Sequence, residues 1–252
     1  MVSLTRLTGY LDELLTPEAF SDYCPNGLQV EGRAQVRRIV GGVTACQALL
    51  EVAAEREADA LLVHHGYFWK SEDPRIVGIK RQRLATLLRH EMSLLAYHLP
   101  LDAHPRYGNN VQLGRRLGIE GGAPLAGRGA AALVWEGRLP EPQSARDWAE
   151  HVAAVLGREP LHVGREQRLL HRVAWCTGAA QGFIEAAAAA GVDAYLTGEV
   201  SEPTVHVARE LGLEFYAAGH HATERYGVQA LGRHLQETLA VEFLFVDVPN
   251  PA

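Results

Sequence analysis

The chain has 252 residues, with 30 acidic and 24 basic side chains, a formal net charge of −6 and 12 histidines. Hydrophobic residues make up 47% of it, which excludes an intrinsically disordered protein because the apolar surface is sufficient to offset chain entropy. The mild acidity argues against a dedicated nucleic-acid-binding protein, which would carry a basic face. The length fits one large domain or two small ones.

The three cysteines, Cys24, Cys46 and Cys176, are odd in number and far apart. They exclude a disulfide framework and a thiolate zinc site, and they indicate a reducing compartment. The first 20 residues lack the continuous apolar core of a secretion signal, and no stretch approaches the roughly 20 apolar residues of a membrane span. We therefore expect a cytoplasmic protein without membrane contact.

Apolar spacing and turn residues predict alternating helices and strands. Leucines at positions 4, 7, 11 and 15 are typical of an amphipathic helix that ends at Thr16-Pro17. After the first β-branched strand, Thr44 is in position to cap a helix, and Ser144 is in position to cap a later one. The alternation predicts an α/β fold with right-handed crossovers. The expected strands cover residues 38–43, 58–63, 92–97, 131–135 and 241–246, and the further helices cover residues 45–56, 81–90, 144–156 and a stretch to about residue 239.

An internal repeat supports two similar α/β domains. A shift of 134 positions aligns residues 38–66 with residues 172–200 without gaps, and it places Asp59 over Asp193. With a changed offset, residues 91–97 resemble residues 210–216. Alanine-rich helices could produce part of this match by chance, but the shared order of strand, helix and strand favours two βαβαβ units.

Histidines and carboxylates gather where the predicted strands end. His64-His65 follows one strand, and His98 follows the next, with Asp102 close behind it. In the second half, Glu199 follows one strand, and His220 follows another, with Glu224 after it. Ligands in parallel α/β sheets bind beyond the carboxyl ends of the strands, so this placement predicts a site.

The donor types point to metal. His220 and Glu224 are four residues apart, which places both on one face of a helix. Imidazole and carboxylate ligands without thiolate suit zinc, iron, manganese or nickel, and a bridging carboxylate can hold two ions that activate water. Each residue also has a structural reading: the histidine pair as hydrogen-bonded structure, Asp102 as a cap and Glu224 as an ion-pair partner of Arg225 or Arg209. The clustering at equivalent strand ends favours the metal site.

The sequence around these residues resembles the Nif-like dinuclear metal-binding family, the GTP cyclohydrolase I type 2 homologues, in its short bacterial form. The resemblance covers essentially the whole chain. It rests on the segments His64-His65-Gly66-Tyr67-Phe68-Trp69, Tyr97-His98-Leu99-Pro100-Leu101-Asp102, Gly108-Asn109-Asn110, Gly219-His220-His221-Ala222-Thr223-Glu224, residues 26–30 (NGLQV) and residues 198–202 (GEVSE).

The resemblance implies a dinuclear site and assigns its residues. Glu224 matches the carboxylate that bridges both ions, and His98 matches a residue that binds metal or transfers protons. His221 stands where many members have tyrosine, and we do not count it among the ligands. Gly66 and Glu199 replace a common proline and aspartate, which alters the rim of the site without removing a ligand. The implied ligands of the two divalent ions are His64, His65, Asp102, His220 and Glu224.

The resemblance also implies the assembly. The family forms a hollow ring of six subunits, a trimer of dimers, in which each subunit has two similar, interlocked α/β domains with mostly parallel sheets. Here the first domain would comprise residues 1–105 with about 222–252, and the second residues 106–221. The metal site would lie in the cleft between them.

Three functions are compatible with this pattern. The first is a metal-dependent hydrolase of a small substrate, a nucleotide or another phosphoester, in which His98 or Glu199 transfers the proton. The second is a non-enzymatic ring that stores or delivers metal or acts as a scaffold, and it would have a closed coordination shell. The third, a nucleic-acid adaptor, is disfavoured by the net charge of −6. Half of the histidines lie at three strand ends, and His104 and His221 could orient ligands from behind.

Overall fold

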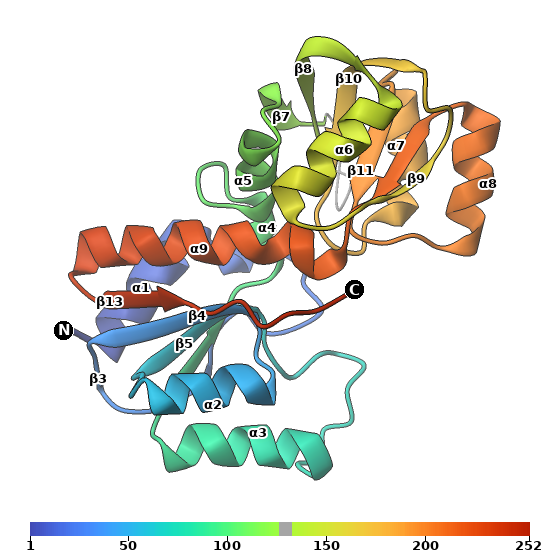
Figure 1. Cartoon of the computed structure of the whole chain (residues 1–252). Helices are drawn as coiled ribbons and strands as arrows, with labels where there is room; N and C mark the ends of the chain where they lie inside the picture. The colour runs from blue at the N-terminus through green and yellow to red at the C-terminus, as the bar shows by residue number, and fades with distance from the viewer. Residues whose placement is uncertain (126–132) are drawn as a thin grey trace. The chain divides into compact units, whose positions relative to one another are not determined.

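The computed structural model describes residues 1–125 and 133–252, and the chain forms two compact units (Figure 1). Unit 1 comprises Met1–Gly108 and Gly227–Pro249, and unit 2 comprises Asn109–Tyr226 and Asn250–Ala252. Unit 1 is therefore built from two separate stretches of the chain. None of the described helices has the length and apolar character that crossing a membrane requires.

Unit 1 contains a five-stranded sheet in the order β13-β4-β5-β6-β2. The first four of these strands are parallel, and β2 runs antiparallel to β6 at the edge. Because β13 pairs with β4, the last strand of the chain completes the sheet of the first unit, as we expected for the C-terminal segment. The strands are β2 (Gly27–Val30), β4 (Arg38–Thr44), β5 (Ala60–His65), β6 (Ser93–Ala96) and β13 (Glu242–Phe245), and β1 (Val2–Ser3) pairs with β3 (Gln35–Val36) in a separate ribbon.

Helices cover both faces of this sheet (Figure 1). Ile39 and Leu62 pack in the same apolar cluster as α1 and the later part of α9, whereas Val40 and Leu61 pack with α2 and α3. Since neighbouring residues of a strand point to opposite faces, both sets are buried, and the strands appear in the sequence as apolar runs. The helices are α1 (Leu4–Leu15), η1 (Pro17–Ala19), α2 (Gln47–Glu55), α3 (Gly78–Arg89), α4 (Leu99–Ala103) and, from Gly227 onwards, α9 (His220–Leu239).

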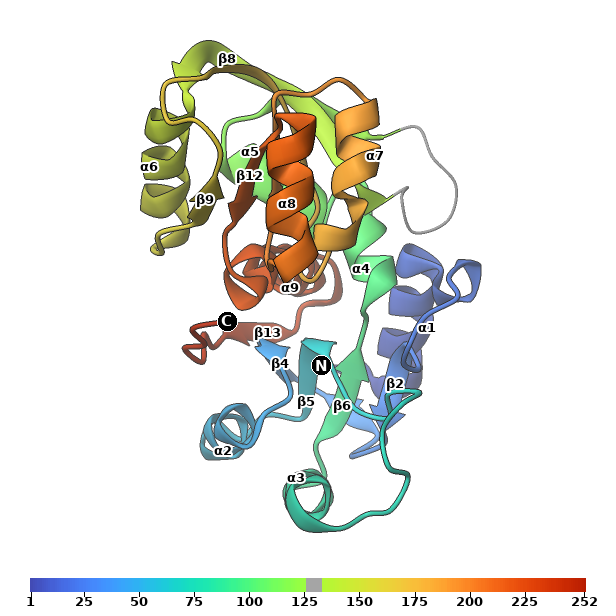
Figure 2. The ribbon, with the colours of Figure 1, turned by 90° about the vertical axis from the view of Figure 1, so that its right-hand side faces the viewer.

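Unit 2 contains a six-stranded sheet in the order β7-β8-β10-β11-β12-β9. The three strands β10, β11 and β12 are parallel, and the flanking strands are antiparallel. Helices α5 and α6 pack on one face, and α7 and α8 pack on the other (Figure 2). The elements are α5 (Asn109–Arg116), β7 (Glu120–Pro124), β8 (Trp135–Ser144), α6 (Ala145–Leu156), β9 (Leu161–Val163), β10 (Leu169–Trp175), η3 (Gln181–Phe183), α7 (Ile184–Ala189), β11 (Ala194–Thr197), α8 (Glu202–Leu211) and β12 (Glu214–Ala217). The α/β class with mostly parallel central strands is confirmed.

The strand register confirms the internal repeat over its first two strands. Ile39 pairs with Ala60 in unit 1, and Val173 pairs with Ala194 in unit 2, so both partners are shifted by the same 134 positions. The aligned Asp59 and Asp193 also play the same part. Asp59 Oδ2 accepts the backbone N–H groups of residues 37 and 38, and Asp193 Oδ2 accepts those of residues 171 and 172.

The alignment expected for the third strand was wrong by two residues. Ser93 and Glu214 occupy equivalent positions, because they pair with Ala60 and Ala194 respectively. The correct offset there is 121, whereas the residues were matched at 119. A shift of two leaves every side chain of a strand on the same face, so the apolar pattern alone does not distinguish the two alignments.

Two local expectations also differ from the structure. Thr44 is the last residue of β4, paired with His65, and α2 begins only at Gln47, so Thr44 does not cap it. Ala131 and Ala132 of the expected strand lie outside the described residues, and β8 begins at Trp135. The Ser144 cap is confirmed, because its hydroxyl accepts the backbone N–H of Asp147.

Replacing Asp59 with alanine is expected to destabilise unit 1. The buried carboxylate accepts two backbone N–H groups and an Arg33 hydrogen bond of 3.1 Å, which the variant loses. We expect the free energy of unfolding to fall by about 1–3 kcal/mol in urea titrations. The control is Asp73→Ala, because Asp73 is exposed and its carboxylate bonds only to Arg75. The control should change stability by less than about 0.5 kcal/mol, and equal stability of both variants would contradict the prediction.

Candidate metal centre

Strands β5 and β6 bring four predicted residues of unit 1 together. His64 and His65 end β5, and His98 follows β6 as the residue that precedes α4. Val63 pairs with Ala96, so the two parallel strands end side by side. Asp102 lies on α4, directly after this strand end. The carboxyl edge of the sheet thus gathers the side chains, as parallel α/β sheets do for their ligands.

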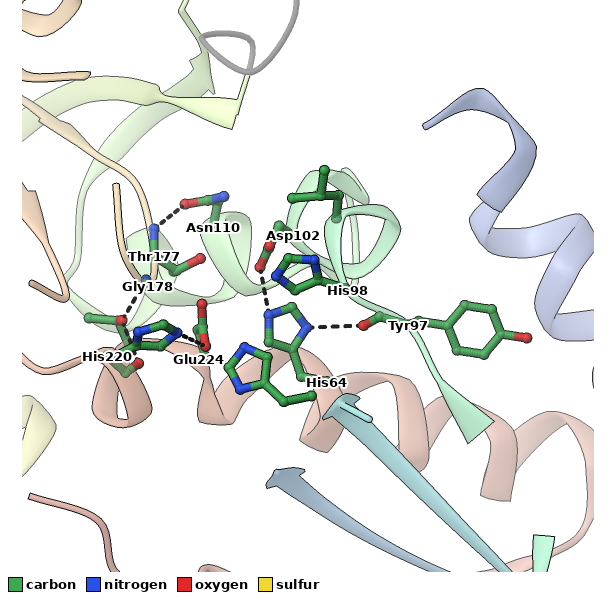
Figure 3. Close-up of polar contacts among 12 residues, drawn as sticks. His64, Tyr97, His98, Asp102, Asn110, Thr177, Gly178, His220 and Glu224 are labelled. Atoms are coloured by element: carbon green, nitrogen blue, oxygen red, sulfur yellow. Dashed lines mark hydrogen bonds and ion pairs between the residues drawn. The ribbon is translucent and has the colours of Figure 1, made fainter. Parts of the chain in front are cut away.

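The three imidazole rings of unit 1 are close neighbours (Figure 3). The His64 ring centroid lies 4.5 Å from that of His65 and 5.0 Å from that of His98. One nitrogen from each of the three rings lies within 4.8 Å of the others. Asp102 Oδ1 lies 3.4 Å from His64 Nε2, and both side chains are buried. This set could hold a metal ion.

Hydrogen bonds to Nδ1 determine which nitrogen of each ring serves as a ligand. His64 Nδ1 donates to the Tyr97 carbonyl oxygen over 3.0 Å, and His98 Nδ1 donates to Asp22 Oδ1 over 2.7 Å. Carbonyl and carboxylate oxygens only accept, so Nδ1 carries the hydrogen and Nε2 has the lone pair in the neutral ring. His65 Nδ1 lies 3.3 Å from the Thr44 hydroxyl. Such outer contacts are typical of metal-binding histidines.

Asp22 is a functional residue that the sequence analysis missed. Its two carboxylate oxygens accept hydrogen bonds from His98 Nδ1, Asn26 Nδ2 and the backbone N–H groups of Tyr23 and Leu99. Burial raises the pKa of Asp22, but these hydrogen bonds outweigh it and lower the pKa to about 2. Asp22 is therefore ionised at neutral pH and holds His98 in one orientation.

The segment at residues 26–30 (NGLQV) orders the loop after the histidine pair. Asn26 Oδ1 accepts the His98 backbone N–H over 2.7 Å. Gln29 Oε1 accepts the Tyr67 N–H, and Gln29 Nε2 donates to the Tyr67 carbonyl. A Cβ atom at Gly66 would overlap the Gln29 amide, so the glycine at this position permits the close approach. This segment is one of those that carry the family resemblance, and its side chains hold the backbone of Tyr67 and His98.

Unit 2 contributes a second pair of candidate ligands. His220 begins α9, and its Nε2 lies 3.1 Å from Glu224 Oε2, one helical turn further on (Figure 3). His220 Nδ1 donates to Glu199 Oε1 over 2.7 Å, so Glu199 orients the ring through the nitrogen that faces away from Glu224. The predicted i, i+4 arrangement is confirmed, and Glu199 has the same relation to His220 as Asp22 has to His98.

The loop after β10 packs closely against the first turn of α9. Gly178 has φ +70°, and a Cβ atom there would overlap Glu224 Oε1. Its N–H donates to the Thr223 hydroxyl, while Asn110 Oδ1 accepts the Thr177 N–H (Figure 3). A positive φ favours glycine, so this residue type lets the backbone lie against the carboxylate.

Opposing effects set the pKa of His220. Burial lowers the pKa, but the hydrogen bonds and charges of Glu224 and Glu199 outweigh it and raise the pKa to about 9. Without a metal ion, the ring is therefore protonated at neutral pH. A metal ligand must be deprotonated, so binding at this nitrogen releases a proton.

We expected His104 and His221 to orient the ligands from behind, and the structure shows other contacts of both residues. His104 Nδ1 accepts the N–H groups of Arg106 and Tyr107, so it orders its own loop. The His221 backbone N–H donates to the Ala252 carbonyl, and the side chain is buried. The Nδ1 atoms of His98 and His220 are instead held by Asp22 and Glu199.

Comparison with known sequences gives a whole-chain match. The model of the family described as DUF34/NIF3 (NGG1p interacting factor 3) matches residues 2–251. A protein of Pseudomonas aeruginosa named GTP cyclohydrolase 1 type 2 homolog is 61% identical over 251 residues, which cover 100% of this chain and 99% of that protein. The Escherichia coli K12 protein of the same name is 53% identical, with 98% and 99% of the chains covered.

Solved structures have the same fold. The structure of protein ybgI, described as of unknown function, has a TM-score of 0.94 and 52% identity, with both chains covered completely. TTHA1606 from Thermus thermophilus has a TM-score of 0.89 and 33% identity, again over 100% of both chains. HcgD from Methanocaldococcus jannaschii, with a TM-score of 0.83 and 21% identity over 98% of each chain, shares the fold.

Metal binding is expected to release a proton from His220. We expect proton release and a rising apparent affinity between pH 6.5 and about 9, measured by calorimetry in buffers of different ionisation enthalpy. In the metal-free protein, the same proton stabilises the fold fully below pH 6.5, and this contribution disappears as the pH rises through about 9. Glu199→Gln removes one of the charges that raise the pKa, so proton release should move to lower pH. If proton release depends on pH in the same way in Glu199→Gln as in the wild type, the released proton does not come from His220.

Proposed function

Because the chain belongs to the DUF34/NIF3 family, we propose that it is a metal-dependent hydrolase of a small substrate. The proposed centre holds two divalent ions through His64, His65, Asp102, His220 and Glu224, with Glu224 as the bridging ligand. The substrate class is a nucleotide or another phosphoester. The name shared by the relatives, GTP cyclohydrolase 1 type 2 homolog, makes ring opening of a purine nucleotide one reaction to test.

The orientation of the histidines is the observation that carries this proposal. His64, His98 and His220 each donate from Nδ1 to a carbonyl or carboxylate oxygen. In two of these rings, Nε2 faces a carboxylate, at 3.4 Å in His64 and 3.1 Å in His220. Buried histidines with a merely structural role have no need of this shared arrangement, whereas metal-binding histidines adopt it regularly.

The proposed ligand set leaves coordination positions open. Two ions with at least about four ligands each require about eight positions, and five residues with one bridging carboxylate supply six. The remaining positions are available to water and substrate, as catalysis requires. A storage or structural centre would instead be closed.

The bound ions would supply Lewis-acid polarisation of the scissile bond and a lowered pKa of the attacking water. His98 is the proposed proton acceptor, because its Nδ1 is already bonded to Asp22 and its Nε2 side lies among His64 and His65. The ionised Asp22 stabilises the imidazolium that forms when His98 takes the proton. The Asn26 hydrogen bond to the backbone of His98 keeps the ring in place.

The proposal extends to assembly and location. We propose a homohexamer, a trimer of dimers in the shape of a ring, as the family resemblance implies, with its small-molecule substrate as the only other partner. A cytoplasmic location fits the three cysteines, all of which are free thiols. Light scattering on the purified protein measures the subunit number directly.

Metal analysis of three variants tests the proposed ligands. Glu224→Ala should lose both ions because it removes the bridge, and His64→Ala should lose at least one, as measured by elemental analysis of purified protein. His206→Ala is the matched control, since His206 is exposed on α8 and, among the residues that the structure describes, pairs only with Glu202. It should retain the wild-type content. Unchanged metal in both ligand variants would refute the site, and one full equivalent in Glu224→Ala would refute the bridge.

Activity assays then separate hydrolysis from storage. The metal-reconstituted protein is screened with zinc, iron, manganese and nickel against GTP, other nucleotides and generic phosphoesters. Turnover that Glu224→Ala abolishes and His206→Ala retains is the expected result. No turnover with any of the four metals, from protein that contains two ions per chain, would favour metal storage or delivery instead.

The role of Asp22 can be separated from metal binding. Asp22→Asn removes the charge that stabilises protonated His98, and we expect kcat to fall about 10²–10⁴-fold, the usual contribution of a proton-transfer residue. His98 is not among the proposed ligands, so the metal content should stay at two ions per chain. Loss of metal from Asp22→Asn would show that Asp22 supports the metal centre itself.

A further inference from the structure

A cavity in unit 2 lies near the start of β12, whereas Glu199 and His220 follow the ends of β11 and β12. It has a volume of about 530 Å³ and lies between β9, the loop that follows β9 and the C-terminal end of α8. Glu214, the first residue of β12, is in its wall. The polar lining comprises His162, Arg165, Arg168, Arg209 and Glu214. The proposed hydrolase mechanism uses none of these residues.

A buried carboxylate shapes one wall of the cavity. Glu214 Oε2 accepts hydrogen bonds from His162 Nε2 over 2.7 Å and from the Arg165 backbone N–H over 2.8 Å. A Cβ atom at Gly164 would overlap the same carboxylate, so the glycine lets the loop lie directly on it. The charge of Glu214 is thus held by groups of the protein, and the loop presents the Arg165 side chain at a defined place.

Two of the three arginines that line the cavity differ from the third in their contacts. The Arg168 guanidinium donates to the Gly212 carbonyl and lies 3.7 Å from Asp193. Among the residues that the structure describes, however, no acceptor or carboxylate bonds to the guanidinium groups of Arg165 and Arg209. One extends from the loop and the other from α8, and both are exposed. Two guanidinium groups without an ion-pair partner in the described part of the chain therefore border one cavity of a chain whose net charge is −6.

The internal repeat supplies a comparison within the same molecule. Unit 1 has a cavity of about 490 Å³ at the equivalent edge of its sheet. There Arg33 bonds to Asp59 and to the His90 carbonyl, as Arg168 contacts Asp193 and Gly212 in unit 2. In unit 1, however, Arg37 lies 3.9 Å from Glu242, and Glu57 adds a further carboxylate to the wall. Within residues 1–125 and 133–252, neither Arg165 nor Arg209 has an ion pair that corresponds to that of Arg37 with Glu242.

We propose that the unit 2 cavity is an oxyanion site that binds the phosphate group of a small molecule through Arg165 and Arg209. Guanidinium groups bind phosphate with two parallel, charge-assisted hydrogen bonds, and two of them together neutralise a dianion. The bound species is inorganic phosphate or a phosphate monoester. This site does not depend on the proposed metal centre, because its residues and its ligand chemistry are distinct from those of the centre.

Residue-specific protection provides the first test. The metal-loaded protein is treated with phenylglyoxal, which modifies accessible guanidinium groups, and each peptide is quantified by mass spectrometry. Inorganic phosphate should slow the modification of Arg165 and Arg209 several-fold. Arg6 is the matched control, because it is exposed on α1 and its side chain has no partner in the described part of the chain, so its rate should stay constant. Glycerol 3-phosphate in place of phosphate identifies which source binds more tightly.

Calorimetric titration of variants provides the second test. Arg165→Gln combined with Arg209→Gln should weaken phosphate binding at least about tenfold, since it removes two charge-assisted contacts. Arg37→Gln, in the equivalent cavity of unit 1, should bind phosphate like the wild type. Three outcomes would each overturn the proposal. Arg6 could be protected as strongly as Arg165 and Arg209, or neither phosphate compound could protect them. The wild type and the double variant could also bind phosphate with equal affinity. Metal content serves as the control for an intact centre in every variant.

Discussion

The register between parallel strands is the constraint on which the candidate centre depends. Val63 and Ala96 are paired, so β5 and β6 end at the same level and release His64, His65 and His98 within one small volume. The strand ends alone do not orient the rings. That task falls to hydrogen-bond acceptors behind them: a backbone carbonyl for His64 and carboxylates for His98 and His220. Position therefore comes from the sheet, and orientation comes from residues outside it.

The sequence alone was sufficient to predict the fold class and to place the histidines and carboxylates at the strand ends. Strands buried on both faces appear as short apolar runs, and the polar residues that follow them lie at one edge of the sheet. The apolar pattern of the strands does not determine every detail of the fold. A period of two cannot distinguish offsets of 119 and 121 for the third strand, and Thr44 suits a strand end as well as a helix cap.

Asp22 illustrates what pattern analysis does not reach. It lies in an irregular segment with no periodicity, and its partner His98 is 76 residues further along the chain. The carboxylate of Glu199 was visible at a strand end, but only the geometry places it on Nδ1 of His220. The same limit applies to the unit 2 cavity. The parallel strands of the two units share their register, but the units differ in which arginines have carboxylate partners. These differences lie in side chains, and the shared strand register does not reveal them.

The pairing of β13 with β4 has a consequence for how the protein is made. The edge of β4 that receives β13 is complete only after residues 242–245 have been synthesised, although β4 itself ends at Thr44. At about 5–20 residues per second, the roughly 200 intervening residues leave that edge without its partner for roughly 10–40 s. An unpaired edge is a template for wrong pairing. Each nascent chain thus carries an unpaired edge of β4 until its synthesis is complete. Neighbouring nascent chains on one messenger RNA expose the same edge to one another.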